Sequence, residues 1–416
     1  MNAPAMLVSM MLLAGLHLPG AQAQEGHAAH SSHAAAAAPE MGKKTAPRLR
    51  SALGSGAAMA PNGDLWLVGL DPDGRLFTQV SPNLGRSWNP PRLLDIGSDK
   101  ISADGENRPK IVFGPNQQLV IAYTQPLAKP NTGEVRLLRS ADGGKTFSAP
   151  VTVHRDRQVI THRFESLAFD RKGVLHSVWI DKRDLTLAMS KAGETSGKSR
   201  VYAGAAIYRN ESRDGGHSFG PDIKLADHSC ECCRIALAPA ADGGVVAMWR
   251  HVFAPNIRDH AFARLGDEAA TPVRASLDGW KLDGCPHHGP ALAPAAQGGY
   301  HAVWFGERAG RTAVRYGRLA ADGTPQGAAQ ELPDPRAEHA DIATSGKQVV
   351  VAWRSYDGAQ TQLKAWVSAD DGAHFILRDL AASPEQNDYP RLLVTTEGIR
   401  VLWRTAKETH VLPVIF

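Results

Sequence analysis

Residues 166–181 read SLAFDRKGVLHSVWID, which is an apolar run, a turn with charged residues and glycine, and a second apolar run that ends near an aromatic residue. The same pattern recurs as AAMAPNGDLWLVGL at 57–70, KIVFGPNQQLVIAYTQ at 110–125 and DIATSGKQVVVAWRS at 341–355. Short apolar runs bounded by turn residues are typical of β-hairpins, and no long stretch of helical periodicity competes with them. The aromatic residues near the ends of the second runs are Trp66, Tyr123, Trp179, Trp249, Trp304, Trp353 and Trp403.

These seven aromatic residues recur at intervals of 49 to 70 residues. A third strand, a tight turn and a fourth strand follow each hairpin, and four-stranded units at this period predict an all-β fold, a β-propeller. Seven blades are favoured, and six are the alternative if one of the hairpins does not belong to a blade. The last unit has room for three strands, so residues 44–53 are predicted to add the fourth and close the ring, because an open ring exposes two sheet edges.

The turns between third and fourth strands share a motif. Residues 140–147 (SADGGKTF) and 212–219 (SRDGGHSF) match S-x-D-x-G-x-[ST]-[FW], residues 368–375 (SADDGAHF) depart at one position, and residues 81–88 (SPNLGRSW) have Asn83 in place of Asp. Asp accepts backbone hydrogen bonds, Gly adopts positive φ, and the aromatic ring packs between sheets. The motif resembles the Asp-box, or BNR repeat, of the sialidase superfamily of β-propellers. In that family the box lies on the face away from the active site, and true sialidases have six blades.

Composition and the N-terminus indicate an exported globular protein. Hydrophobic residues make up 43% and charged residues 21% of the 416-residue chain, and the net charge of +4 includes no Lys/Arg block of the kind that binds nucleic acid. Residues 1–23 are predicted to be a signal peptide, because the apolar stretch 6–18 is too short to span a bilayer and Ala21-Gln-Ala23 suits cleavage. The mature chain is therefore expected to be periplasmic or secreted, without a transmembrane segment.

Residues 24–45 form an Ala-rich leader that carries His27, His30 and His33, and residues 46–416 form the propeller domain. Two interpretations of the leader stay open: a flexible segment whose histidines bind a soft metal ion, and a spacer that aids solubility.

The links into the inner strands are unusually polar. In a propeller these links lie on one rim, around the mouth of the central channel, so their side chains are predicted to converge there. The polar stretches are Glu106-Asn107-Arg108, His162-Arg163-Phe164-Glu165, Cys230-Glu231-Cys232-Cys233-Arg234, Cys285-Pro286-His287-His288, Glu338-His339-Ala340-Asp341 and Asn387-Asp388-Tyr389-Pro390-Arg391.

All four cysteines fall in links into adjacent blades, and we therefore expect them to be neighbours in space. An even number in an exported protein favours two disulfides that tie the two links together. A soft-metal site for copper or zinc is the alternative, since thiolates and imidazoles select such ions. One disulfide beside a His-lined ligand pocket, and inert free thiols, also stay open. The candidate ligands are Cys230, Cys232, Cys233, Cys285, His287 and His288.

The resemblance to sialidases implies a second set of candidates. That family holds the substrate carboxylate with three arginines and uses a Tyr nucleophile helped by Glu, with an Asp acid/base. Tyr389 and Glu165 could stand in for the nucleophile pair. The family's N-terminal Arg-Ile-Pro motif is missing, and Asn107-Arg108-Pro109 is the nearest string. The arginines that could hold the carboxylate are Arg108, Arg163, Arg234, Arg250, Arg354, Arg391 and Arg404. Of these, Arg108, Arg163, Arg234 and Arg391 are kept as the candidates.

Three functions are therefore carried forward. The first is an exported sialidase-like propeller with a Cys/His site for a small ligand or a metal at the channel mouth. The second is an exo-acting glycoside hydrolase of the sialidase type that acts on anionic sugars. The third is a scaffold whose propeller face docks another exported protein.

Overall fold

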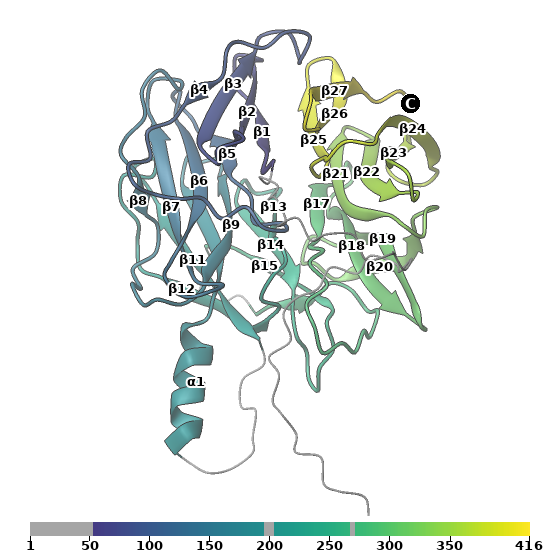
Figure 1. Ribbon diagram of the computed structural model, residues 1–416. Coiled ribbons are helices and arrows are strands. Elements are labelled where there is room, and N and C mark those ends of the chain that lie inside the picture. The colour runs from purple at the N-terminus through teal and green to yellow at the C-terminus, as the bar shows by residue number, and fades with distance from the viewer. Residues whose placement is uncertain (1–52, 195–203, 267–270) are drawn as a thin grey trace, which may run out of the picture. The chain divides into compact units, whose positions relative to one another are not determined.

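The strands form seven antiparallel sheets that follow one another in chain order around a ring (Figure 1). The computed structural model describes residues 53–194, 204–266 and 271–416. The first blade contains β1 (Gly56–Met59), β2 (Leu65–Leu70), β3 (Leu76–Ser81) and β4 (Arg92–Leu93). The second contains β5 (Lys110–Phe113), β6 (Leu119–Pro126), β7 (Gly133–Ser140) and β8 (Val151–Thr152). The third contains β9 (His162–Phe169), β10 (Leu175–Asp181), β11 (Ala205–Ser212) and β12 (Ile223–Ser229).

The remaining four blades repeat this order from the inner strand outwards. The fourth contains β13 (Ala236–Pro239), β14 (Val245–Arg250), β15 (His260–Arg264) and β16 (Val273–Arg274). The fifth contains β17 (Ala291–Pro294), β18 (Tyr300–Arg308), β19 (Arg311–Leu319) and β20 (Pro325–Glu331). The sixth contains β21 (Glu338–Ser345), β22 (Gln348–Tyr356), β23 (Thr361–Ser368) and β24 (Ile376–Ser383), and the seventh contains β25 (Arg391–Thr395), β26 (Gly398–Arg404) and β27 (Thr409–Pro413).

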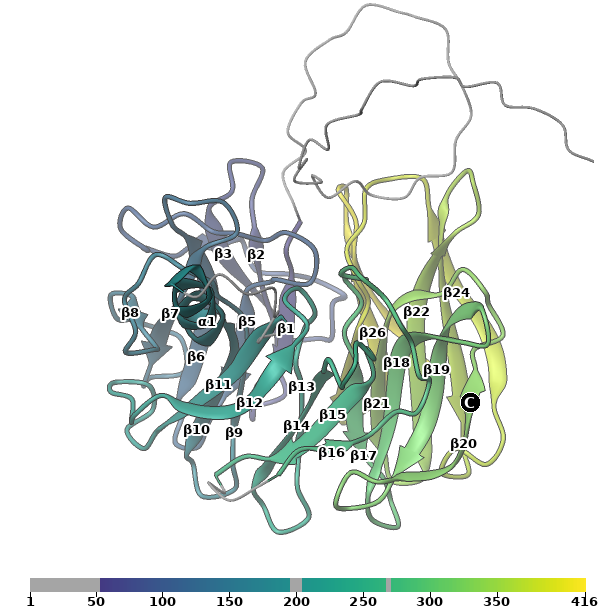
Figure 2. The same cartoon turned by 90° about the horizontal axis from the view of Figure 1, so that it is seen from below.

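Seven blades are thus confirmed, and six are excluded. The ring closes where the seventh blade packs against the first, because β25 lies beside β1 (Figure 1). Figure 2 shows the same blades from below. Leu65, Leu67 and Phe77 of the first blade share one buried cluster with Leu393 and Leu402 of the seventh. The fourth strand that the sequence predicts at 44–53 lies almost wholly outside the described residues.

The hydrophobic core consists of seven layers, one between each pair of neighbouring sheets. The second strand of each blade carries an aromatic residue into one of these layers. Trp179, Trp249, Trp353 and Trp403 are among the largest fully buried side chains. Truncating a buried Trp to Ala typically costs about 3–5 kcal/mol, so these residues anchor the stack of blades.

The four turns that carry the repeated motif share one hydrogen-bond pattern. The Oγ atoms of Ser81, Ser140, Ser212 and Ser368 accept hydrogen bonds from the glycine amides four residues later, at 2.8–2.9 Å. The glycine of each turn has positive φ. A Cβ at Gly144 would lie 2.2 Å from the Trp66 ring of the preceding blade, so a side chain is excluded there. The motif therefore seats each turn against the neighbouring blade.

One helix, α1 (Arg183–Glu194), interrupts the third blade between β10 and β11. The sequence reading expected strands throughout, and the long interval of 70 residues between Trp179 and Trp249 was the signal of this insertion. Asp181 caps the helix, because its Oδ1 accepts a hydrogen bond from the Arg183 amide at 2.9 Å. In the part of the chain that the structure describes, no helix has the length and apolar character needed to cross a membrane.

Candidate functional site

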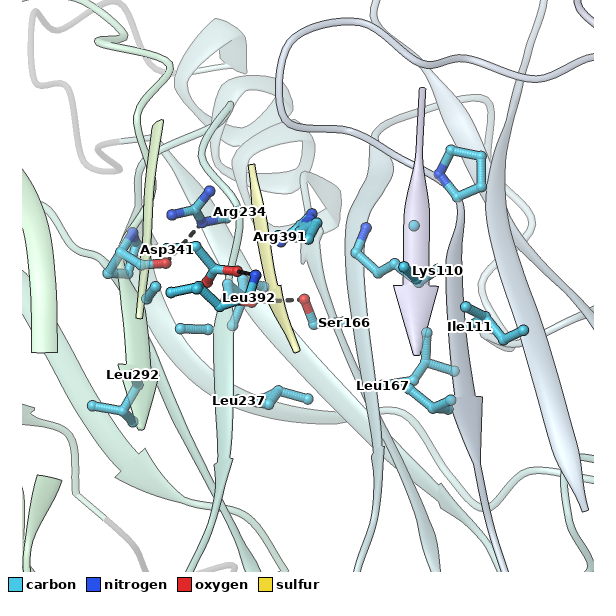
Figure 3. Close-up of a pocket in the computed structure, with 18 residues that line it drawn as sticks. Lys110, Ile111, Ser166, Leu167, Arg234, Leu237, Leu292, Asp341, Arg391 and Leu392 are labelled. Atoms are coloured by element: carbon cyan, nitrogen blue, oxygen red, sulfur yellow. Dashed lines mark hydrogen bonds between the residues drawn. The ribbon is translucent and has the colours of Figure 1, made fainter. Parts of the chain in front are cut away.

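The inner strands of all seven blades line a central channel with a cavity of about 260 Å³. Figure 3 shows its two ends. Lys110, Arg234, Asp341 and Arg391 gather at the end where the inner strands begin, while leucines such as Leu237 occupy the other end. The polar end is the rim at which the sequence predicted that the links converge. We call it the channel mouth.

Two cations at the channel mouth keep bonding capacity for a ligand. Within residues 53–194, 204–266 and 271–416, the Arg391 guanidinium has neither a hydrogen-bond partner nor an ion-pair partner, although Asp341 and Asp388 interact with it electrostatically. The Lys110 Nζ atom donates to the Arg108 carbonyl at 2.9 Å and lies 3.5 Å from Glu165 Oε1. Burial lowers the pKa of Lys110, and the Glu165 carboxylate opposes that shift. Both side chains could bind an anionic group.

Glu106, in the link into the second blade, contacts residues of three other blades at the channel mouth. Its Oε2 atom accepts hydrogen bonds from the backbone amides of Arg234 at 3.2 Å and Gly289 at 2.5 Å. Its Oε1 atom lies 3.2 Å from Arg234 Nη1 and 3.1 Å from His339 Nδ1. Burial alone raises the pKa of Glu106, but the Arg234 charge and the His339 hydrogen bond hold it far below its ordinary value. Glu106 is therefore a buried carboxylate that stays ionised.

His339 is oriented by this carboxylate. The register of β21 shifts between Glu338 and Asp341, and His339 adopts a φ of 51°, which is uncommon for a residue with a side chain. Because ionised Glu106 only accepts hydrogen bonds, it places the imidazole proton on Nδ1 and leaves Nε2 as an acceptor. Burial lowers the pKa of His339, although the Glu106 hydrogen bond opposes the shift. The residue is thus a neutral base at pH 7.

Tyr389 lies between cationic and imidazole groups. Its ring stacks on His339 with centroids 3.6 Å apart, and the guanidinium carbons of Arg108 and Arg354 lie 4.4 and 4.6 Å from the ring centroid. Burial raises the pKa of Tyr389, against the charges of Arg108 and Arg354. The phenol is therefore neutral at pH 7 and available as a proton donor.

Most of the candidate arginines are occupied by protein groups. Arg234 donates to the carbonyls of Pro290 and Ala340 and pairs with Glu106. Arg108 pairs with Asp388 at 2.7 Å, and Arg163 pairs with Asp104. The structure therefore brings these arginines to one rim but leaves Arg391 as the free guanidinium among them.

Glu165 does not meet Tyr389. Its Oε2 accepts a hydrogen bond from Thr124 at 2.8 Å, and its Oε1 faces Lys110. The carboxylate linked to Tyr389 is Glu106, through His339. Sequence reasoning named the polar links that hold Glu106 and His339 but did not single out these two residues. Their contacts depend on the bulge at His339, which the sequence pattern does not reveal.

Of the two histidines in the link that carries Cys285, His288 packs against the His339 ring. His288 stacks on His339 with centroids 4.2 Å apart and on Phe305 at 4.5 Å. One nitrogen or carboxylate atom from each of His288, Glu338 and His339 lies within 4.8 Å of the others, a group that could hold a metal ion. His288 therefore belongs to the Tyr389 cluster.

The four cysteines form one cluster of free thiols. The Cys230 Sγ atom lies 3.9 Å from that of Cys232, 3.8 Å from that of Cys233 and 3.9 Å from that of Cys285. The predicted proximity of the two cysteine links is thus found. The two disulfides that the sequence favoured are not formed, because sulfur–sulfur bonds require about 2.05 Å. Hydrogen bonds from the other three thiols lower the pKa of Cys230 well below its ordinary value.

The sequence matches no protein-family model and no curated protein. Among solved structures, it is similar to an ulvan lyase, a polysaccharide lyase solved with a bound GlcA–Rha3S saccharide, at 12% identity and a TM-score of 0.56 over 86% of this chain and 91% of that chain. It is also similar to the α-L-arabinofuranosidase of Fusarium graminearum solved with arabinobiose, at 12% identity and a TM-score of 0.51 over 77% of this chain and 95% of that chain. A Hadza microbial sialidase matches at 12% identity and a TM-score of 0.47, over 81% and 72% of the two chains.

The likenesses to the ulvan lyase and the arabinofuranosidase, together with the seven blades, show a β-propeller fold. The fold expected from the repeated turn motif is thereby confirmed.

Proposed function

We propose that this protein hydrolyses a glycosidic bond in an anionic saccharide bound at the channel mouth. The observation that carries the proposal is the stacking of a neutral phenol, Tyr389, on a neutral imidazole, His339, at the rim that also carries the free Arg391 guanidinium. Cleavage of a glycosidic bond requires a general acid and a general base in reach of the bond, and these two residues supply one of each.

We expect the cationic side chains at the channel mouth to bind the substrate. Arg391 and Lys110 line the polar end of the channel and would hold a carboxylate or sulfate by charge-assisted hydrogen bonds. A neutral sugar would leave the half-buried Arg391 guanidinium without a hydrogen-bonded anion, which costs binding energy. The site therefore favours an acidic saccharide.

The proton transfers follow from the two protonation states. His339 Nε2 takes a proton from water, whose oxygen forms the new bond to the anomeric carbon. Tyr389 gives its phenolic proton to the oxygen that leaves as the glycosidic bond breaks. The imidazolium then returns a proton to the phenolate, so the enzyme is restored and one water is consumed.

The solved structures of similar fold support a saccharide as the substrate class. The ulvan lyase was solved with a saccharide that contains glucuronate and a sulfated rhamnose, and the arabinofuranosidase with arabinobiose. Export and docking of an exported protein remain predictions from the sequence.

The test is a panel of uronate-containing, sialylated and sulfated saccharides incubated with the full chain. We expect release of new reducing ends from an acidic member and none from the same saccharide after reduction of its carboxyl groups. A product with the ultraviolet absorbance of an unsaturated uronate would overturn hydrolysis in favour of elimination. If the protein neither cleaves nor binds any member of the panel, the proposed function is wrong.

A further inference from the structure

We propose that Cys230, Cys232, Cys233 and Cys285 form a binding site for a single divalent thiophilic cation, and that zinc is the ion that fits it best. The site is separate in chemistry from the proposed saccharide cleavage. It would hold together the links into the fourth and fifth blades.

Three sulfurs surround the Cys230 sulfur at distances that suit ligands of one ion, and Cys285 would complete the set of four by a small shift, because it is close to Cys230 but outside the group of three mutually close sulfurs. Four sulfurs at the corners of a regular tetrahedron, with zinc–sulfur bonds of about 2.3 Å, are separated by about 3.8 Å. The three distances from the Cys230 sulfur are 3.9, 3.8 and 3.9 Å. The sulfurs of Cys230, Cys232 and Cys233 also lie within 4.8 Å of one another. Packed thiols in van der Waals contact have similar separations, so the case for an ion depends on the meeting of four thiols together with the charges around them.

The ligand set consists of sulfur alone. Among the described residues, the group around Cys230 that could hold a metal contains cysteines and no imidazole. His288 is engaged with His339 and Phe305 instead. Four thiolates in a tetrahedral arrangement favour zinc or an iron–sulfur centre over copper(II), which prefers square-planar nitrogen and oxygen ligands.

Two guanidiniums, one buried and one half-buried, balance the charge of such a site. Arg250 is 1% exposed and donates only to the carbonyls of Arg258, His288 and Phe305. Arg258 donates to the Leu282 carbonyl and lies 3.6 Å from the Cys230 sulfur. Neither has a carboxylate partner within the described ranges.

Four thiolates around one divalent cation carry a formal charge of about −2, which the two guanidiniums neutralise. Two disulfides would leave both cations without an anion. A monovalent ion would leave one negative charge in excess. The surroundings of the sulfurs therefore favour a divalent ion.

The position of the cluster gives the ion a structural role. Cys233 immediately precedes Arg234, and Cys285 lies four residues before Gly289, and the amides of Arg234 and Gly289 both donate to Glu106 Oε2. An ion that fixes the two links also fixes the pair of donors that orient Glu106.

The experiment is metal analysis of the full chain purified under reducing conditions with zinc. We expect one zinc per chain and, after exchange for Co²⁺, the intense sulfur-to-cobalt charge-transfer absorption of a thiolate site. X-ray absorption of the wild-type protein should count four sulfur ligands. This measurement does not depend on any variant's folding or on saccharide cleavage.

The variants are Cys285→Ser and, as the matched control on the same link, His287→Gln. Cys285→Ser should weaken zinc binding by at least about tenfold in competition with a chelator, a loss of about 1.4 kcal/mol, while His287→Gln should leave it unchanged. An intact mass that shows two disulfides, a folded reduced protein that binds no zinc, or loss of zinc from His287→Gln would overturn the four-thiolate site.

Discussion

The imidazole of His339 lies flat against the phenol ring of Tyr389, with the ring centroids 3.6 Å apart and the planes inclined by 15°. The two residues belong to the links and inner strands of neighbouring blades. Glu106, from a third blade, holds the Nδ1 atom of the same imidazole. The proposed acid and base are therefore positioned jointly by three blades, and several variants can separate their roles.

The pH dependence of activity should report the His339 imidazole. Burial lowers its pKa below the ordinary value of 6.5, so we expect kcat/KM to be constant near neutral pH and to fall only at more acidic pH, with a midpoint below 6.5. In Glu106→Gln the carboxylate that raises this pKa is gone, and the midpoint should move to still lower pH. The measurement is a pH profile of kcat/KM, with His374→Gln as control because His374 is 89% exposed. A wild-type midpoint at or above 6.5 would refute the assignment.

Glu106 should also contribute to stability. Glu106→Gln leaves the Arg234 guanidinium buried without its anion, and we expect a loss of about 3–5 kcal/mol in the free energy of unfolding at pH 7. Since the folded-state pKa is depressed, the contribution is present above the ordinary value of 4.5 and is lost as the pH falls below it. The difference between wild type and variant in urea unfolding should therefore shrink in acid.

The control for the Glu106–Arg234 ion pair is the variant Glu397→Gln, which removes one partner of an exposed ion pair. Glu397 is 48% exposed and pairs with Arg400 at 2.6 Å, so its removal should cost at most about 1 kcal/mol. Equal stability of wild type and Glu106→Gln at pH 7 would show that the Glu106 network carries no such energy.

Arg391 should determine affinity for the acidic group. A charge-assisted hydrogen bond contributes about 1.5–3 kcal/mol, so Arg391→Met should raise KM for the acidic saccharide by about tenfold to a hundredfold. Arg378→Met serves as the control, because Arg378 donates to the Ile415 carbonyl in an exposed contact. Steady-state kinetics on the substrate found in the panel provide the readout. An unchanged KM in Arg391→Met would remove Arg391 from the site.

The repeated turns should affect stability and leave activity intact. Ser212 is 1% exposed, and its Oγ accepts from the Gly216 amide at 2.8 Å. Ser212→Ala leaves that buried amide without a partner and should cost about 1–3 kcal/mol in thermal or urea unfolding, with kcat/KM unchanged at a temperature where both proteins are folded. Ser190→Ala on the exposed part of α1 should change stability by less than about 0.5 kcal/mol. Loss of activity in folded Ser212→Ala would contradict the separation of the turn from the active site.

The sequence predicted the ring because the fold depends on a local pattern. Each hairpin, each turn glycine and each buried aromatic such as Trp179 is specified within its own blade. The same periodicity predicted that the two cysteine links are neighbours, and the Cys230 and Cys285 sulfurs lie 3.9 Å apart although they are distant in the chain. The helix α1 was missed because a single insertion does not follow the period.

The pairing of side chains at the channel mouth could not be predicted in the same way. Glu106 contacts Arg234, Gly289 and His339, which belong to three other blades. The position of a residue within its repeat predicts the rim on which it lies, but not the side chains that it contacts there. Tyr389 was assigned Glu165 as its helper on the analogy to sialidases, whereas the bulge in β21 brings His339 to its ring.

The most direct measurement is the rate of reducing-end release by Tyr389→Phe beside the wild type. Phe keeps the ring that stacks on His339 and removes the proton, so we predict a fall in kcat of about a hundredfold to ten-thousandfold with unchanged unfolding behaviour. The matched variant Tyr356→Phe, whose hydroxyl donates to the Gly358 carbonyl at an exposed position, should retain the wild-type rate. A Tyr389→Phe protein that releases reducing ends as fast as the wild type would contradict the assignment of the channel mouth as the active site.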